Sequence, residues 1–307
     1  MDVPLNTNTR YIYSTSGNPA SIVKYNTGLQ KLGLHHLVYF TFDSSITPAV
    51  YAGVLRAPFC RGGAVTAHNG LKSTIIPYLD VVEPLALQCR AVNTVIRNTT
   101  DGKLYGYNTD VHGLRRALLK GLQLFRDTNN TKNNTDIQTA VIYGTGGVSG
   151  VAWYVLKELL PEEGQIILVG RNPAKVVQKR SDLGIQDEED PPYFAGPYDL
   201  VVDATPLASQ PSSAWPAPFR TMCAEAKIVF CHAMPEPPHR NYLQKFCQHH
   251  HVAYIPGSWM HVAQMVKQYS LYFAQEEDKE VDDDDTIPRT TTITEEDICA
   301  TWNLELP

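Results

Sequence analysis

The sequence lacks the features that would mark a membrane protein or a disulfide-stapled one. No stretch approaches the roughly 18 consecutive apolar residues that a spanning helix needs, and the first sixteen residues match neither a secretory signal nor an anchor. Six cysteines in 307 residues form no C-x-x-C pair and are far too sparse for a disulfide scaffold. We therefore expect a soluble, cytoplasmic protein whose cysteines are free, buried thiols.

Charge is also scarce, at 19% of residues, and it is unevenly distributed. The formal net charge is −6, but residues 276–307 hold twelve of the thirty-two acids and only two of the twenty-six bases, so residues 1–275 are weakly basic. Neither nucleic acid nor an anionic membrane is indicated as a partner. The run of like charges predicts a solvated, mobile acidic tail over 276–307. Docking of 276–285 on a basic partner is the less favoured alternative.

The apolar content, 43%, is enough for two domains with hydrophobic cores. Short β-rich runs alternate with helical stretches over residues 1–125, which is the order of an α/β layer. A polar run at 126–138 breaks this pattern, and buried strand-like runs then alternate with helices over 136–256. The sequence therefore predicts an α/β fold of two domains, an N-terminal α/β domain and a Rossmann-type domain with a parallel sheet.

A glycine-rich turn separates the first strand and the first helix of the second half. It is Gly144-Thr145-Gly146-Gly147-Val148. In dinucleotide folds such glycines let the backbone approach a pyrophosphate, whose charge is met by the N-terminus of the next helix. A strand before the turn and a helix after it favour nucleotide binding over a merely structural tight turn.

No acid stands at the end of the next strand, QIILVG, where an NAD-specific site has one for the ribose 2′-hydroxyl. The residues that follow include Arg171, Asn172 and Lys175. Basic groups at this place favour the 2′-phosphate of NADP, with NAD as the alternative. Considered alone, Arg171 is equally well explained as an exposed residue at the start of a helix.

Several polar motifs stand out in both halves. The first half contains VTAHNGLK at 65–72, AVNT at 91–94 and GYNTD at 106–110. The second adds YDLVVDATPLA at 198–208 and GSWMHVAQ at 257–264, after the glycine turn. In this order they resemble the shikimate and quinate dehydrogenase family, whose pattern is V-T-x-P-x-K, A-V-N-T, G-x-N-T-D, N-A-T-P and G-x-x-M-x-x-x-Q.

This resemblance implies an oxidoreductase that exchanges a hydride between NADP and a ring hydroxyl or ketone of a cyclic hydroxy acid, such as shikimate or quinate. The family's catalytic pair maps onto Lys72 and Asp110. A lysine ammonium can stabilise the negative charge that develops on the reacting oxygen and can deliver a proton to it. An aspartate bonded to the lysine and the substrate fixes their geometry. Without this context, Lys72 would be taken for a solvated surface residue.

The resemblance also implies ligands for the substrate. Thr66, Asn93 and Gln264 would hold its hydroxyls or its carboxylate. Considered alone, Asn93 is more simply a cap of the local backbone, whereas Gln264 lies in an apolar helix and needs a partner. The helix at 258–275 would return to the first domain, because it carries a ligand of that domain.

Two domains with different roles are thus implied. Residues 1–125 would bind substrate and residues 136–256 would bind NADP, with Thr205 and Gly257 beside the cofactor. No metal site is expected, since the run at 249–251 has three histidines but no spaced carboxylate or cysteine. A monomer and a homodimer both remain open.

The sequence departs from the family pattern near the predicted substrate site. The loop before Lys72 is two residues longer than in the family. The family's S-x-S-P motif has no clear counterpart. Ser14 and Ser16 supply two hydroxyls but lie five residues too far from Asn26, which leaves Ser21 near the expected position.

Two positions differ near the cofactor: Asp203 replaces the family's Asn, and Ala233 stands where a tyrosine is usual. These changes affect the expected substrate more than the reaction. One alternative is a dehydrogenase for a different, specialised substrate. Another is a non-catalytic sensor or regulator on the same fold. Retention of Lys72 and Asp110 argues against the sensor, because binding alone does not need a proton-transfer pair.

Overall fold

The computed structural model describes eight stretches of the chain, which divides into two compact units. The first unit is Met1–Thr109 with Gln264–Leu306, and the second is Asp110–Ala263 with Pro307. Each unit is built on its own sheet. The described residues are 8–15, 19–41, 45–66, 70–129, 137–185, 196–235, 240–273 and 294–302.

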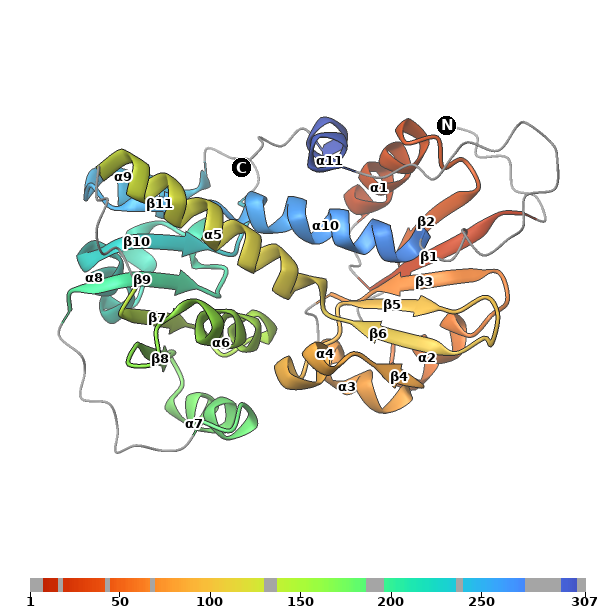
Figure 1. Cartoon of the computed structure of the whole chain (residues 1–307), viewed down its shortest axis with the longest axis horizontal. Coiled ribbons are helices and arrows are strands. Elements are labelled where there is room, and N and C mark those ends of the chain that lie inside the picture. Colours follow the sequence, from red (N-terminus) through yellow and green to blue (C-terminus); the bar gives the residue numbers. More distant parts are fainter. Residues whose placement is uncertain are drawn as a thin grey trace. The chain divides into compact units, whose positions relative to one another are not determined.

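The first unit contains a six-stranded mixed sheet in the order β2-β1-β3-β5-β6-β4 (Figure 1). Strand β1 runs parallel to both β2 and β3, so the carboxyl ends of β1 and β3 lie at the same edge. Strand β5 is antiparallel to β3 and to β6, and β4 is parallel to β6. The strands are β1 Arg10–Ser14, β2 Leu37–Thr41, β3 Cys60–Ala64, β4 Val81–Val82, β5 Thr94–Arg97 and β6 Leu104–Tyr107.

Short helices connect these strands and bury their apolar residues against the sheet. Thr47 and Pro48 begin α2, where the Thr47 hydroxyl accepts a hydrogen bond from the Val50 amide. Leu71 of α3 lies in one buried cluster with Val95 of β5. This packing fixes the short helix that carries Lys72. The helices are α1 Pro19–Lys31, α2 Pro48–Leu55, α3 Leu71–Thr74, α4 Pro84–Cys89 and a 3-10 turn at Ile76–Tyr78.

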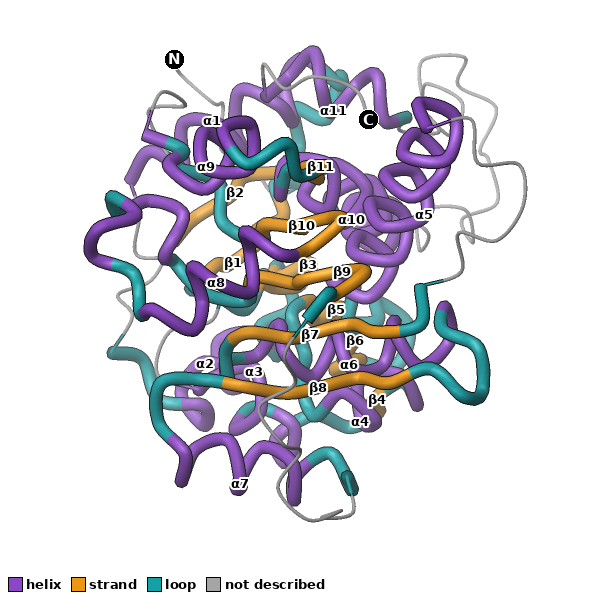
Figure 2. Tube along the Cα trace, turned by 90° about the vertical axis from the view of Figure 1, so that its left-hand side faces the viewer, coloured by secondary structure: helices purple, strands orange, loops and turns teal. Residues whose placement is uncertain are grey.

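The second unit contains a five-stranded sheet in the order β11-β10-β9-β7-β8, with every neighbouring pair parallel (Figure 2). All five carboxyl ends therefore lie at one edge, which is where doubly wound sheets bind ligands. The strands are β7 Thr139–Tyr143, β8 Gln165–Val169, β9 Tyr198–Asp203, β10 Ala226–Cys231 and β11 Ala253–Ile255. The predicted α/β fold with a Rossmann-type parallel sheet is confirmed.

Helices follow the strands of this sheet in the alternation that the sequence predicts. Asn172 and Asn241 cap α7 and α9, because their side chains accept hydrogen bonds from the amides of Lys175 and Gln244. The helices are α5 Thr109–Asn129, α6 Gly147–Leu159, α7 Pro173–Asp182, α8 Ala217–Glu225, α9 Tyr242–His249 and α10 Gly257–Phe273, with 3-10 turns at Leu207–Ser209 and Ser212–Ala214.

The division between the units differs from the predicted boundary at residue 125. The first unit ends at Thr109, because α5 packs against the second unit. Arg115 of α5 donates to Glu158 of α6 at 2.9 Å, and a side chain at Gly121 would collide with Ile255 of β11. Within α10, the residues from Gln264 onward belong to the first unit.

The prediction of a mobile tail over 276–307 is wrong at its end, where α11 (Glu295–Trp302) forms and packs on α1 (Figure 1). Thr294 caps this helix by accepting a bond from the Asp297 amide, and the Asp297 carboxylate bonds back to Thr294. Ile298 is fully buried. The net charge of the whole segment gave no indication of this short capped helix. The acids in its first turn interact favourably with the positive end of the helix dipole.

All six cysteines are buried and none forms a disulfide, as predicted. In the part of the chain that the structure describes, no helix combines the length and the apolar character needed to cross a bilayer.

Candidate active site

Asn93 is the centre of a buried polar network in the first unit. It is 2% exposed, and its Oδ1 accepts hydrogen bonds from the Thr109 amide at 2.8 Å and from Thr94 Oγ1 at 2.9 Å. Its Nδ2 donates to Thr109 Oγ1 at 2.9 Å. Gln268 of α10 donates to Thr94 Oγ1 at 2.9 Å. The side chain of Asn93 therefore ties the start of β5 to the start of α5, as the simpler interpretation of a backbone cap anticipated.

Lys72 and Asp110 each adjoin this network through their backbones. The Lys72 carbonyl accepts a hydrogen bond at 2.8 Å from the amide of Val92, the residue before Asn93. Asp110 directly follows Thr109 and is buried in the first turn of α5, where the helix dipole favours a negative charge. The Lys72 side chain is half-buried. The pairing of the two charged groups stays a prediction.

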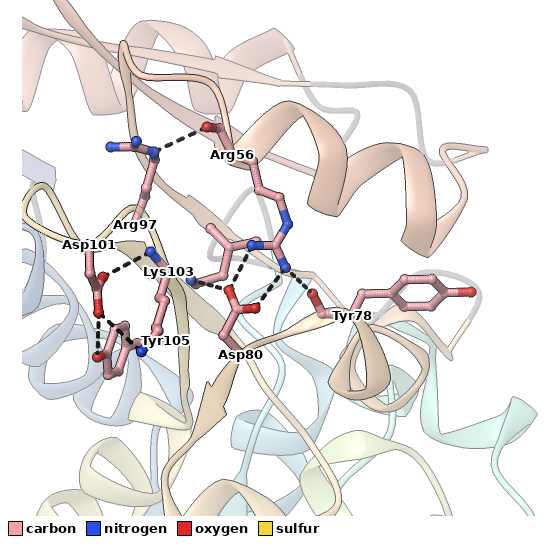
Figure 3. Close-up of polar contacts among 8 residues, drawn as sticks. Arg56, Tyr78, Asp80, Arg97, Asp101, Lys103 and Tyr105 are labelled. Carbon is pink, nitrogen blue, oxygen red and sulfur yellow. Dashed lines mark hydrogen bonds and ion pairs between the residues drawn. The ribbon is translucent and has the colours of Figure 1, made fainter.

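An ion-pair network anchors the segment that follows Lys72 (Figure 3). Arg56 Nη1 lies 2.7 Å from Asp80 Oδ2, and its Nη2 donates to Asp80 Oδ1 at 3.2 Å and to the Tyr78 carbonyl at 3.1 Å. Asp80 also accepts a bond from the Leu104 amide at 2.8 Å. The hydrogen bond from Arg56 is the main cause that lowers the pKa of Asp80. The segment after α3 is thereby tied to α2 and β6.

Thr66 bonds to a residue that the sequence reasoning missed, Thr15. The Thr66 amide donates to Thr15 Oγ1 at 2.9 Å, and Thr66 Oγ1 donates to the Thr15 carbonyl at 2.9 Å. Thr15 directly follows β1 and Thr66 lies two residues after the end of β3, the parallel neighbour of β1; Thr15 is 1% exposed. Of the serines predicted here, Ser14 is buried within β1, whereas Ser16 and the side chain of Ser21 lie outside what the structure describes.

Two glutamines lie one turn apart on α10. Gln268 is buried in the Asn93 network, whereas Gln264 is half-buried and makes no hydrogen bond to any described residue. The role of Gln264 as a substrate ligand stays a prediction. The spacing of two amides at i and i+4 on an apolar helix was the signal that could have revealed Gln268.

In the second unit, the glycine turn joins β7 to α6 and requires glycine at its first position. Gly144 has φ of +125°, and a Cβ on it would lie 2.9 Å from Thr205 Cγ2 and 3.0 Å from the Ala204 carbonyl oxygen. Only glycine fits there. Gly146 precedes α6 and offers no side-chain cap, while a Cβ on it would meet nothing within 4 Å. The amides at the start of α6, from Gly147, are thus approachable by an anion.

The residues predicted to hold a 2′-phosphate lie at the end of β8. The Gly144 amide donates to the Val169 carbonyl at 2.8 Å, which joins the glycine turn to this strand end. Arg171 and Lys175 are exposed, and neither side chain is paired with an acid in the described stretches. Asn172 Oδ1 accepts a hydrogen bond from the Lys175 amide at 3.2 Å, so this side chain is the N-cap of α7. This donor set fits NADP.

The ends of β9 and β10 complete this edge of the sheet. Thr205 donates to Asp203 Oδ1 through its amide at 3.0 Å and its hydroxyl at 2.5 Å. A Cβ on Gly257 would lie 2.5 Å from the His232 carbonyl oxygen and 2.6 Å from that of Cys231. Gly257 is therefore required for the close approach of α10 to β10.

No family model matches the sequence, but curated proteins and solved structures do. The chain is 39% identical to the "Pentafunctional AROM polypeptide" of Yarrowia lipolytica over 145 residues, which is 47% of this chain and 8% of that one. It is 33% identical to the "Shikimate dehydrogenase (NADP(+))" of Moorella thermoacetica over 58% of this chain and 59% of the relative. It is 28% identical to the "Shikimate dehydrogenase (NADP(+))" of Bacillus mycoides over 66% of this chain and 71% of the relative.

The solved structures agree with this relationship. A shikimate 5-dehydrogenase-like protein superposes with a TM-score of 0.67 at 20% identity, covering 98% of both chains. A shikimate dehydrogenase in complex with NADP+ gives 0.66 at 22% identity, over 88% of this chain and 92% of that one. The chain is thus similar to shikimate dehydrogenases in sequence and in fold. At these identities the structural likeness establishes the fold.

Asn93 allows a stability test of the polar network in this shikimate dehydrogenase relative. Replacing Asn93 with alanine leaves the Thr109 amide and the Thr94 hydroxyl buried with fewer partners, and we expect a loss of about 3 kcal/mol in the free energy of unfolding. Asn172→Ala, which removes an exposed helix cap, is the matched control and should cost about 1 kcal/mol. Urea denaturation measures both. Equal losses would contradict the network's role.

Proposed function

We propose that this chain is an NADP-dependent oxidoreductase of the shikimate dehydrogenase type. The reaction is hydride exchange between the nicotinamide and a ring hydroxyl or ketone of a cyclic hydroxy acid. The observation that carries this proposal is the position of Asn93 between the two charged residues. Val92, the residue before Asn93, donates its amide to the Lys72 carbonyl, and Asn93 Oδ1 accepts from the amide of Thr109, the residue before Asp110. We assign substrate binding to the first unit and dinucleotide binding to the second.

Lys72 and Asp110 are assigned the proton chemistry. The Lys72 ammonium, at Nζ, stabilises negative charge on the reacting oxygen and donates or accepts the proton there. The Asp110 carboxylate is bonded to the lysine and to the substrate hydroxyl and holds both in position. Thr66, Gln264 and the serines near β1 bind the remaining hydroxyls and the carboxylate. The amide of Gln264, which has no partner in the described chain, supports that role.

The second unit holds the cofactor at the carboxyl edge of its sheet. Gly144, Gly146 and the first amides of α6 receive the pyrophosphate, and Arg171 with Lys175 receives the 2′-phosphate. Bound NADP supplies a nicotinamide ring that accepts or donates the hydride. Thr205, which lies against Gly144, and Gly257, which lies against the end of β10, are assigned positions beside the cofactor.

The substrate proposed first is shikimate, because the relatives carry its name. Quinate is the next candidate. The test follows nicotinamide absorbance with NADP or NAD against shikimate, quinate and related hydroxy acids. Turnover with NADP and one of these acids is the expected result. Binding of an acid without turnover across the whole panel would instead indicate a sensor on this fold.

Arg171→Asp tests the preference for NADP. Loss of a charge-assisted contact and its replacement by repulsion should raise the dissociation constant of NADP by about ten- to a hundredfold. The affinity for NAD should change little, since NAD lacks the 2′-phosphate. Lys179→Asp, on the last turn of α7, is the control with the same change of charge. Isothermal titration measures both cofactors, and an unchanged preference would reject the assignment.

A further inference from the structure

Asp203 is a fully buried acid at the ligand-binding edge of the second sheet. It is the last residue of β9, with 0% of its surface exposed. In the register it is paired with Tyr143 of β7, directly before the glycine turn, and with Cys231 of β10. A carboxyl group therefore lies inside the protein where the mechanism above assigns it no role.

Only one of the two carboxyl oxygens of Asp203 has partners. Oδ1 accepts hydrogen bonds from the amide and the hydroxyl of Thr205 at 3.0 and 2.5 Å. Oδ2 is inaccessible to solvent and has no hydrogen-bond partner. No cation pairs with Asp203 in the stretches that the structure describes. A buried polar atom without a partner is costly, so Oδ2 calls for a proton and an acceptor for it.

Titratable residues adjoin Asp203 on β7 (Tyr143), at the end of β10, where the His232 amide donates to the Asp203 carbonyl at 3.0 Å, and in a cluster of thiols. Cys231 lies on β10, Cys223 on α8 and Cys247 on α9, and the Asp203 charge raises the pKa of each in addition to the effect of burial. Burial raises the pKa of Asp203 itself to about 7, and the bonds from Thr205 oppose this increase. Since the thiols stay neutral, Asp203 is the member of this group of one acid and three thiols that changes charge near neutral pH.

Asp203 is connected to the glycine turn through the residues that follow it. The Ala204 amide donates to the Tyr143 carbonyl at 3.0 Å. The Thr205 methyl and the Ala204 carbonyl border the space that a side chain at Gly144 would need. Movement of Thr205 would therefore change the packing of its methyl group against Gly144 of the turn.

We propose that Asp203 is a positioning residue for the dinucleotide, which binds tightly when the carboxyl is neutral and weakly when it is ionised. The neutral acid accepts both bonds from Thr205 at Oδ1 and presents a proton at Oδ2. The ionised acid is a buried negative charge beside the proposed site of the phosphates, and none of the described residues pairs a cation with it. This inference rests on the proposed function of the glycine turn as a dinucleotide site.

The test is the pH dependence of NADP affinity, measured by titration calorimetry without substrate. Between about pH 6 and about pH 8, the dissociation constant of the parent chain should rise about tenfold relative to that of Asp203→Asn. The comparison with the variant cancels the titration of NADP itself. Asp199→Asn is the matched control on the same strand, where the carboxylate is paired with Lys227 at 2.6 Å. It should follow the parent.

Two further variants separate positioning from mere structure. Thr205→Ser keeps the hydroxyl that Asp203 binds and should retain the pH profile, whereas Thr205→Val should weaken NADP binding at every pH. Parallel profiles for the parent and Asp203→Asn would overturn the inference, with the dinucleotide site intact. Absence of NADP binding by the parent at every pH would overturn both the site and the inference.

A readout without cofactor completes the test. Ionisation of Asp203 opposes folding, because its pKa is higher in the folded chain than the ordinary 3.8; stability therefore falls as pH rises towards about 7. Asp203→Asn should unfold at a higher temperature than the parent at about pH 8, and this difference should become smaller at about pH 5. Equal unfolding temperatures at both pH values would contradict a buried acid that ionises near neutrality.

Discussion

Replacing Lys72 with methionine is expected to lower the turnover of shikimate by about a thousandfold, which is within the range for loss of a general acid–base group. Methionine keeps most of the length and the apolar stem of lysine but has no proton to transfer and no charge to place beside the reacting oxygen. The packing of Leu71 and the backbone bond from Val92 to the Lys72 carbonyl do not depend on the ammonium. The fold should therefore survive, and steady-state kinetics measures the loss.

The control for Lys72→Met is Lys157→Met on the exposed face of α6, which should leave turnover unchanged. NADP affinity should be equal in both variants and the parent, because Lys72 is assigned to the substrate and not to the cofactor. Full turnover in Lys72→Met would refute the catalytic assignment. Loss of turnover together with loss of NADP binding would point to damage beyond the catalytic group.

Replacing Gly144 with valine is expected to reduce both stability and NADP binding. The φ of +125° is strained for any residue with a Cβ, and the added atoms would meet Thr205 and the backbone of Ala204. Together, the backbone strain and the clash should cost about 3 kcal/mol in the free energy of unfolding. The turn would also move away from the position that admits a pyrophosphate, so we expect NADP affinity to fall at least tenfold.

Two other glycines separate the causes of this effect. Gly184→Ala introduces a side chain at φ of +67° with nothing within 4 Å, so it should show the backbone strain alone, about 1 kcal/mol. Gly146→Ala adds a methyl group into open space, which should leave stability unchanged and still weaken NADP binding. Urea unfolding and calorimetric titration measure the series. Normal NADP affinity in Gly146→Ala would argue against a pyrophosphate at this turn.

The second unit was the more predictable half of the molecule, because its signals are local. The strand, the glycine turn and the helix follow one another in the chain, so the sequence around Gly144 predicts them together. The prediction that Arg171 binds a 2′-phosphate likewise depends only on its position shortly after a strand. The separation of the units at Thr109 was not visible, since α5 continues the helical pattern of the first half but buries its side chains in the second.

The polar network of the first unit could not be derived from local patterns. Thr15 and Thr66 meet because β1 and β3 are parallel neighbours, although 51 positions separate the two threonines. Gln268 reaches Thr94 across 174 positions. Such pairs are set by the order of strands in the sheet, which periodicity does not reveal. The helix α11 was missed for a different reason. The high net charge of the segment indicated a solvated tail, and the Thr294 cap and the buried Ile298 were too few to indicate a helix.

Transfer of deuterium tests the central claim most directly. Shikimate that carries deuterium on the carbon bearing the reacting hydroxyl is incubated with NADP and the chain, and the reduced nicotinamide is analysed by mass spectrometry. We expect deuterium in the reduced cofactor, formed about a thousandfold more slowly by Lys72→Met. Failure of the parent chain to transfer deuterium to NADP, although calorimetry detects binding of both shikimate and NADP, would contradict the proposed hydride transfer.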